Sequence, residues 1–194
     1  MMIRIAITPE HLDDESREAL TARVLLESGW DKVHLRHPGA SRTDIRRLIE
    51  AIPQKFHDRL VLHGHFDLCN DFNLGGLHLN HRCPAPPPLY RGPLSRSCHS
   101  VEELRHCTKL AYATLSPIFD SISKQGYDSR FSEADLTQLS DITTPVIALG
   151  GVTPEQIPVL RRYNFKGFAM LGAIPWNEPA DHVRQFAEKI MKLQ

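Results

Sequence analysis

Short apolar runs alternate with longer amphipathic stretches along the whole chain of 194 residues. Strands are expected where the apolar runs lie, at residues 3–7, 32–36, 59–63, 75–79, 94–97, 110–115, 145–149 and 166–171. Helices are expected between and after them, at residues 16–28, 42–51, 66–73, 100–107, 132–140, 154–163 and 180–192. This order is typical of parallel β/α units, and eight units predict a compact α/β fold, a (β/α)8 TIM barrel, as a single domain over residues 1–194.

One link departs from this alternation. Between the fourth and fifth expected strands, residues 83–88 read CPAPPP, and Pro93 follows. Because proline lacks a backbone N–H and disrupts a helix interior, we expect an extended Pro-rich link in place of the helix. That replacement explains how eight units fit a chain just below the usual length of such barrels. An open doubly wound sheet is the alternative, but no G-x-G-x-x-G motif follows the first expected strand.

The composition excludes several classes of partner. The 23 lysines and arginines balance the 23 aspartates and glutamates, so no overall positive field favours nucleic acid. No apolar run approaches the roughly 18 residues of a membrane span, and the N-terminal run is too short for a signal peptide. The four cysteines show no C-x-x-C spacing. These features predict a cytoplasmic protein with reduced thiols and no membrane partner.

Glycines end the seventh and eighth expected strands, as Gly150 and Gly151 and as Gly172 after Leu171. Active sites of such barrels lie where the strands end, and the loops after strands seven and eight frequently bind phosphate. Because glycine allows the backbone to approach a ligand closely, we expect Gly150, Gly151, Leu171 and Gly172 to bind phosphate. Tight turns without a ligand are the alternative explanation of these glycines.

Other strand ends offer a cation and hydroxyl groups. Arg36 ends the second expected strand and shares one face of it with His34. A guanidinium at the barrel mouth suits a diphosphate or a carboxylate, with a salt bridge at the rim as the alternative. In the long loop after the sixth strand, Ser121, Ser123 and Lys124 are expected to close over a charged substrate, unless that loop is only solvated.

Histidines are concentrated at the strand ends, since eight of the 11 lie between residues 34 and 99. We expect His63 or His65 to exchange hydrogen bonds or protons with substrate, and His34, Ser97 and His99 to contact it. No acidic residue ends the third or fourth strand, so we expect no metal and keep a histidine-bound metal hydrolase as an alternative. The site is expected to change its charge between about pH 6 and pH 7, near the ordinary pKa of histidine.

Six segments in this order resemble the thiamine phosphate synthase family and its thiazole tautomerase branch, the TenI-like proteins. The family patterns V-Q-L-R-E-K, L-I-I-N-D-R-V-D-L and G-V-H-L are similar to VHLRHP, LVLHGHFDL and GLHL in this chain. Its serine-containing fifth strand end, G-P-I-F-P-T-x-T-K and P-V-V-A-I-G-G-I are similar to RSCHS, SPIFDSISK and PVIALGGV. The resemblance covers nearly the whole chain and implies the same barrel.

The family's synthase joins a pyrimidine methyl diphosphate to thiazole phosphate and releases pyrophosphate, with Mg²⁺. The resemblance implies a position for each substrate, and it does so residue by residue. The pyrimidine diphosphate would lie near Arg36, His63, Ser97 and Lys124. The thiazole phosphate would lie on Ser121, Ser123, Gly151, Leu171 and Gly172.

The chain also departs from the family patterns. His63 takes the place of an asparagine, and the two magnesium aspartates fall on Gly64 and Cys83. The tautomerase branch also has glycine at the first of these positions, but its candidate catalytic histidine falls on Pro117. Because Mg²⁺ prefers carboxylate oxygens, the departures favour proton transfer on thiazole phosphate without a cofactor.

Two alternatives remain at this point. One is the synthase reaction, with Mg²⁺, and the other is a non-catalytic barrel that binds a phosphate ligand. The expected partner is in each case a small phosphate molecule, thiazole phosphate first, and a homodimer is compatible with the sequence.

Overall fold

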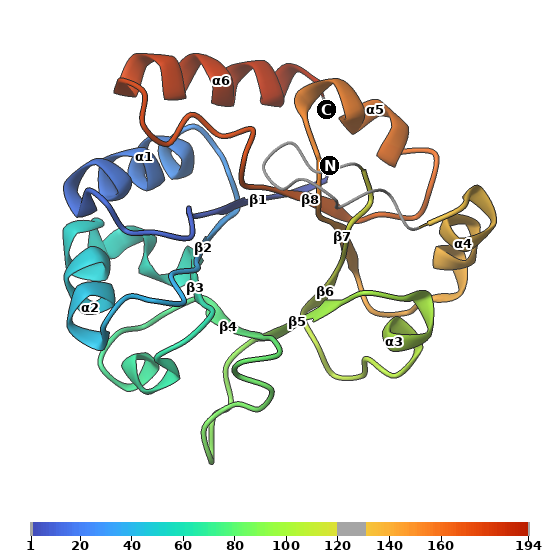
Figure 1. Ribbon diagram of the computed structural model, residues 1–194, viewed down its shortest axis with the longest axis horizontal. Helices are drawn as coiled ribbons and strands as arrows, with labels where there is room; N and C mark the ends of the chain where they lie inside the picture. Colours follow the sequence, from blue (N-terminus) through green and yellow to red (C-terminus); the bar gives the residue numbers. More distant parts are fainter. Residues whose placement is uncertain (1, 120–130, 194) are drawn as a thin grey trace.

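The computed structural model describes residues 2–119 and 131–193, and they form a closed barrel of eight parallel strands (Figure 1). Each strand pairs with its neighbours in the sequence, and the last pairs with the first. The strands are β1 (Ile3–Ile7), β2 (Lys32–Leu35), β3 (Leu60–Leu62), β4 (Gly76–Leu79), β5 (Leu94–Cys98), β6 (Tyr112–Leu115), β7 (Val146–Ala148) and β8 (Gly167–Met170). The predicted (β/α)8 barrel is confirmed.

The helices surround the strands on the outside of the barrel (Figure 1). They are α1 (Glu15–Glu27), α2 (Arg42–Ala51), α3 (Val101–Arg105), α4 (Glu133–Thr137), α5 (Ile157–Leu160) and α6 (Ala180–Lys192). Short 3-10 turns are η1 (Gln54–Arg59), η2 (Phe66–Asn70), η3 (Gln138–Asp141) and η4 (Pro154–Gln156). Within the described ranges, no helix combines the length and the apolar character needed to cross a bilayer.

Serine side chains begin two of the outer helices. Ser41 accepts a hydrogen bond from the backbone N–H of Asp44, whose carboxylate in turn accepts from the backbone N–H of Ser41. Ser132 and Asp135 form the same reciprocal pair at the start of α4. Each pair satisfies two groups that the first helical turn leaves without a backbone partner. Local sequence therefore fixes where these helices start.

Two links around β3 differ from the expected helices. The predicted helix at 66–73 is the 3-10 turn η2, and a further 3-10 turn, η1, precedes β3. At Gly75 the chain passes close to the backbone of Asp58, so that an added Cβ would lie against the Asp58 carbonyl oxygen. Gly75 therefore permits the close contact between the segment before β3 and the segment before β4.

The Pro-rich link between β4 and β5 contains no helix in residues 80–93, all of which the structure describes. Figure 1 shows this segment as a loop that extends from the barrel beside β4 and β5. Leu89 lies in it with a positive φ of 68° and is 82% exposed. The missing helix shortens the chain without interrupting the closed sheet.

The interior of the barrel has an apolar half and a polar half. Inward side chains of β1, β7 and β8 form a small apolar cluster that includes Ile5, Ile147 and Ala169. The strands on the other side place polar side chains inside, and these are buried: His34, His78, Ser95 and Tyr112. The larger hydrophobic core lies between the strands and the outer helices. The polar half is the part of the interior that lies next to β2 through β6.

Closure of the barrel depends on the space beside Gly167, which pairs with Ile3 of β1 and Ile147 of β7. A Cβ at Gly167 would press against the Ile3 carbonyl oxygen and lie 2.7 Å from Cδ1 of Ile147. We predict that Gly167→Ala lowers the free energy of unfolding by about 1–3 kcal/mol, measured by urea denaturation. Gly39→Ala is the control, since nothing lies within 4 Å of its added Cβ. Equal stabilities of the two variants would contradict this role of Gly167.

Candidate active site

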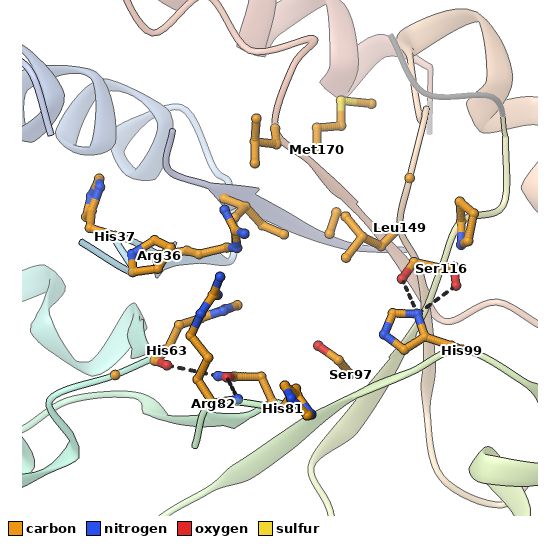
Figure 2. A pocket seen from close by; sticks show the side chains of 18 of the residues that line it. Arg36, His37, His63, His81, Arg82, Ser97, His99, Ser116, Leu149 and Met170 are labelled. Atoms are coloured by element: carbon orange, nitrogen blue, oxygen red, sulfur yellow. Dashed lines mark hydrogen bonds between the residues drawn. The ribbon is translucent and has the colours of Figure 1, made fainter. Parts of the chain in front are cut away.

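A cavity of about 630 Å³ opens at the ends of the strands, where the barrel fold places active sites (Figure 2). Its size is within the range of small-molecule sites. Arg36, His63 and Arg82 lie on one side of it, and Ser116 and His99 lie on the other (Figure 2). The cavity therefore brings together residues that follow β2 through β8.

Most of the residues expected at the site line this cavity. Those that do are Arg36, His63, His65, Ser97, His99, Gly150, Gly151, Leu171 and Gly172. Ser121, Ser123 and Lys124 lie outside the described residues. His34 is not part of the lining, because it points into the barrel below and is 0% exposed. His34 is connected to the cavity by its hydrogen bond to His63.

Several lining residues were not singled out by the sequence: His37, Asn80, Arg82, Ser116 and Met170. All follow or end strands, so their positions at strand ends were the available signal. Asn80 shows why such a residue matters, since its side-chain amide donates to the His63 carbonyl oxygen at 2.9 Å. It thereby connects the loops after β3 and β4.

The cavity wall is cationic and rich in imidazoles. Arg36 and Arg82 belong to it, and none of the described residues that line it is an aspartate or a glutamate. The nearest ion pair at the rim joins Arg36 Nη1 to Glu10 Oε2, 3.6 Å apart. Even with this ion pair, the two guanidinium groups leave an excess of positive charge in the wall, which favours an anionic ligand.

Magnesium does not fit this wall. The two positions at which the resemblance implies magnesium aspartates, Gly64 and Cys83, both line the cavity. Neither offers an oxygen ligand from its side chain, whereas Mg²⁺ is bound by hard oxygen ligands. At Gly64 an added Cβ would meet nothing within 4 Å, so the space for a side chain exists. The carboxylate at this position is therefore missing because the residue is glycine, and the surrounding structure leaves space for the side chain of an aspartate.

The glycine loops form the opposite wall. Gly150 and Gly151 have positive φ angles of 91° and 64°, a region that favours glycine. An added Cβ at Gly150 would lie 2.7 Å from Cα of Pro117. These two glycines therefore allow the chain after β7 to turn tightly beside the loop after β6. They also leave backbone at the cavity surface.

Below the cavity, histidines and hydroxyl groups form a connected polar cluster. His34 Nδ1 lies 2.8 Å from His63 Nε2, and His34 Nε2 lies 2.6 Å from the Tyr112 hydroxyl. The His78 nitrogens lie 2.8 Å from the hydroxyls of Ser95 and Ser97. The His63 and His78 rings stack with centroids 4.3 Å apart. The cluster connects the cavity wall to the barrel interior.

Burial keeps these imidazoles neutral. It lowers the pKa of His34 and of His63 well below the usual value, and nearby His78 lowers both further. Burial also lowers the pKa of His78 to about 3. For these three residues the expected change of charge between pH 6 and pH 7 is therefore wrong, because burial in the barrel could not be inferred from sequence position. At neutral pH they are unprotonated bases.

The same three histidines are near enough to surround an ion, with one nitrogen of each within 4.8 Å of the others. The His34 and His63 nitrogens, however, share a hydrogen bond at 2.8 Å. Two nitrogens bound to one tetrahedral zinc ion are about 3.3 Å apart. The observed arrangement is thus that of a hydrogen-bonded network, and an ion would require these rings to separate.

The neutral histidines predict acid-labile stability. In the unfolded chain they take up protons near pH 6.5, while in the folded protein they stay neutral, so lower pH favours unfolding. We expect the free energy of unfolding to fall between about pH 6.5 and pH 5, by up to about 1.4 kcal/mol per pH unit for each histidine. Denaturant titrations across this range measure the slope.

The matched variants are His34→Gln, which removes one of the three groups, and His182→Gln, which removes an exposed histidine of α6. The first is expected to reduce the slope by about one proton, and the second to leave it unchanged. A slope that is identical in the wild type and in His34→Gln would contradict the neutral, buried state of His34.

Comparison with known proteins identifies relatives of this chain. Residues 5–174 match the family model described as "Thiamine monophosphate synthase". A thiamine-phosphate synthase of Halalkalibacterium halodurans is 27% identical over 160 residues, covering 76% of this chain and 75% of the relative. One from Bacteroides fragilis is 25% identical over 174 residues, covering 79% of this chain and 83% of the relative.

Solved structures show the same similarity. A crystal structure described as thiamine phosphate pyrophosphorylase from Bacteroides thetaiotaomicron has a TM-score of 0.85 and 32% sequence identity, covering 100% of this chain and 97% of that one. A protein of that description from Pyrococcus furiosus has a TM-score of 0.74 at 17% identity, over 99% and 95% of the two chains, and supports the fold alone.

Proposed function

The chain belongs to the thiamine monophosphate synthase family, and within this family we propose that it binds thiazole phosphate and moves a proton on its ring. This is the reaction of the TenI-like branch, an isomerisation in which a proton leaves one atom of the substrate and another is added elsewhere. No group is released and no electron is transferred, so the reaction needs a base and an acid and no metal.

The observation that carries this proposal is the neutral imidazole of His63 in a cavity wall whose described residues include no carboxylate. A neutral imidazole accepts a proton and returns it as an acid. Ionisation of a diphosphate, in contrast, needs the leaving charge to be neutralised, which in the synthase reaction is a task for Mg²⁺. The wall therefore retains groups for proton transfer and lacks those for metal-assisted bond cleavage.

A bound phosphate would also make His63 a better base. After burial, the positive charge of Arg36 is among the causes that lower the pKa of His63. An anion in the same cavity opposes that effect and raises the pKa of His63. We assign the phosphate to the cationic wall and to the backbone of Gly151 and Gly172, with Ser121, Ser123 and Lys124 as further candidates. The negative charge of the bound phosphate then couples substrate binding to the basicity of His63.

An assay with unaromatised thiazole phosphate tests this function. The wild type is expected to accelerate the isomerisation over buffer, and His63→Gln to lower kcat by about 10²–10⁴-fold, as for the loss of a general base. His182→Gln is the control, since its side chain lies exposed on α6. Turnover that is undiminished in His63→Gln would contradict the role of His63, and no acceleration by the wild type would contradict the reaction.

The same samples separate catalysis from binding. A barrel that only binds the phosphate would be stabilised against thermal unfolding by the ligand without turning it over. That combination in the wild type would support the non-catalytic alternative and contradict the proposed isomerase.

A second candidate function is the synthase reaction. It is favoured by the names of the curated relatives and by the presence of Arg36 and Ser97 in the cavity wall. The double variant Gly64→Asp, Cys83→Asp introduces the carboxylates that Mg²⁺ requires. Space for the first is open, because nothing lies within 4 Å of a Cβ at Gly64.

We predict that the wild type couples pyrimidine methyl diphosphate and thiazole phosphate slowly, and that the double variant gains Mg²⁺-dependent coupling of about tenfold or more. The double variant Gly64→Asn, Cys83→Asn is the matched control, since it adds similar volume without charge. Rapid Mg²⁺-dependent coupling by the wild type would favour the synthase over the isomerase.

A further inference from the structure

A second histidine, His99, borders the cavity on the side opposite His63 (Figure 2). It directly follows β5, and its backbone N–H donates to the Glu103 carboxylate at 2.8 Å. The next residue, Ser100, caps the start of α3 by accepting from the backbone N–H of Glu103. The backbone of His99 is therefore held between the end of a strand and the start of a helix.

The ring of His99 is oriented by the loop after β6. Its Nδ1 lies 3.1 Å from the carbonyl oxygen of Ser116 and 3.3 Å from the Ser116 hydroxyl oxygen. A carbonyl oxygen can only accept, so it is satisfied when Nδ1 carries a hydrogen, as it always does in the imidazolium form. The other ring nitrogen, Nε2, faces the interior of the cavity (Figure 2). This nitrogen can exchange a proton with a bound ligand.

The two histidines differ in their exposure to water. Burial lowers the pKa of His63 well below its usual value, so this ring is neutral. His99 is exposed, so water solvates its charged form, and the Ser116 carbonyl oxygen accepts a hydrogen bond from that form. Two titratable groups in such different surroundings are suited to serve as base and acid in one site.

The remaining imidazoles of the cavity wall do not combine these properties. His65 follows the same strand as His63, and its Nε2 lies 2.9 Å from the Ala40 carbonyl oxygen. His37 Nε2 is paired with a buried carboxylate of α1 at 2.7 Å. The ring of His81 makes no hydrogen bond within the described residues, so nothing there orients it. His99 alone among these rings is both oriented by the protein and opposite His63.

We propose that His99 is a second catalytic residue, the acid that delivers a proton to the substrate from Nε2 after His63 has removed another. The inference rests on the proposed function, in which His63 is the base. The substrate hydrogen leaves as a proton to His63, and the electron pair of the broken bond shifts through the substrate. At a different atom it forms a bond to the proton that His99 gives up. His63 ends protonated and His99 neutral, and proton exchange with water restores both.

The positions of the two rings account for this division of roles. A proton that is removed at one atom and added at another needs an acceptor and a donor at two places. His63 and His99 follow β3 and β5 and lie on opposite sides of the cavity (Figure 2). Delivery from His99 also limits the negative charge that the substrate carries once its proton has left. An acid opposite the base therefore serves the second half of the isomerisation.

His99→Gln tests the inference, because glutamine keeps a side-chain N–H for the Ser116 carbonyl oxygen but does not deliver a proton at neutral pH. Its rate of isomerisation is expected to fall by about 10²–10⁴-fold, as for the loss of a general acid. In D₂O, however, His63 still removes the substrate hydrogen and returns deuterium to the same atom. We therefore expect this variant to exchange that hydrogen at an undiminished rate, measured by mass spectrometry of the recovered substrate.

Two further variants give the contrasting patterns. His63→Gln removes the base and is expected to lose both exchange and isomerisation. His106→Gln is the matched control and is expected to change neither, since this exposed histidine follows α3 and contacts Glu102 outside the cavity. A merely structural role of His99 would not give lost isomerisation with retained exchange, because a distorted cavity would slow both.

The two proposals can fail separately. Undiminished isomerisation by His99→Gln, or the loss of exchange together with isomerisation, overturns the role of His99 and leaves the proposed isomerase in place. Exchange without isomerisation by the wild type overturns the role of His99 and supports His63 as a base. A wild type that does neither overturns both proposals. Should His99→Gln not fold, His99→Asn is judged by the same two rates.

Discussion

Closure of the parallel sheet is the constraint on which the rest of this structure depends. Once β8 pairs with β1, inward side chains in the middle of the strands, such as Ile5, His34 and His78, are enclosed without access to water. Apolar side chains fill one half of this interior. In the other half, the histidines and Ser95 have partners within the barrel, since a buried donor or acceptor without one is costly. The hydrogen bonds of His34 to His63 and to Tyr112 meet this requirement.

The site takes its properties from the same enclosure. The lower part of the histidine cluster is buried, which makes its imidazoles neutral, while the strand ends above it carry arginines and glycine loops. A neutral base next to a cationic wall suits a substrate that is an anion at one end and loses a proton at the other. The barrel keeps the buried histidines apart from the arginines, because His34 and His78 lie in the interior while Arg36 lines the cavity above them.

Much of this could be predicted from the sequence, and the reason is periodicity. Apolar runs of strand length in regular alternation with amphipathic stretches specify the barrel, and a barrel specifies that strand ends form the site. This placed Arg36, His63, His65, Ser97 and His99 at the cavity. The proline run likewise indicated which helix is missing.

Two kinds of feature could not be predicted. One is how deeply a residue is buried below the cavity, and the other is which residue on another strand it contacts. His34 lies within β2 and Arg36 directly follows its end, so Arg36 lines the cavity while His34 stays buried below it. Tyr112 was not recognised because its partner is on β2, far along the chain. The neutral state of the buried histidines was missed for the same reason, since burial, and not residue type, lowers their pKa.

Membership of the family specifies the fold, but the charged groups at the strand ends determine which reaction the site can perform. One barrel scaffold supports several reactions, and the reaction follows from the groups at the strand ends. Gly64 and Cys83 stand where the resemblance implies two magnesium aspartates, while the glycine loops that we propose to bind phosphate still line the cavity. A reaction that expels pyrophosphate depends on the lost groups. A reaction that only relocates a proton depends on a neutral base, and His63 above the buried half of the barrel provides one. Under the proposed function, the loss of these carboxylates weakens the synthase reaction and leaves the proton transfer unaffected.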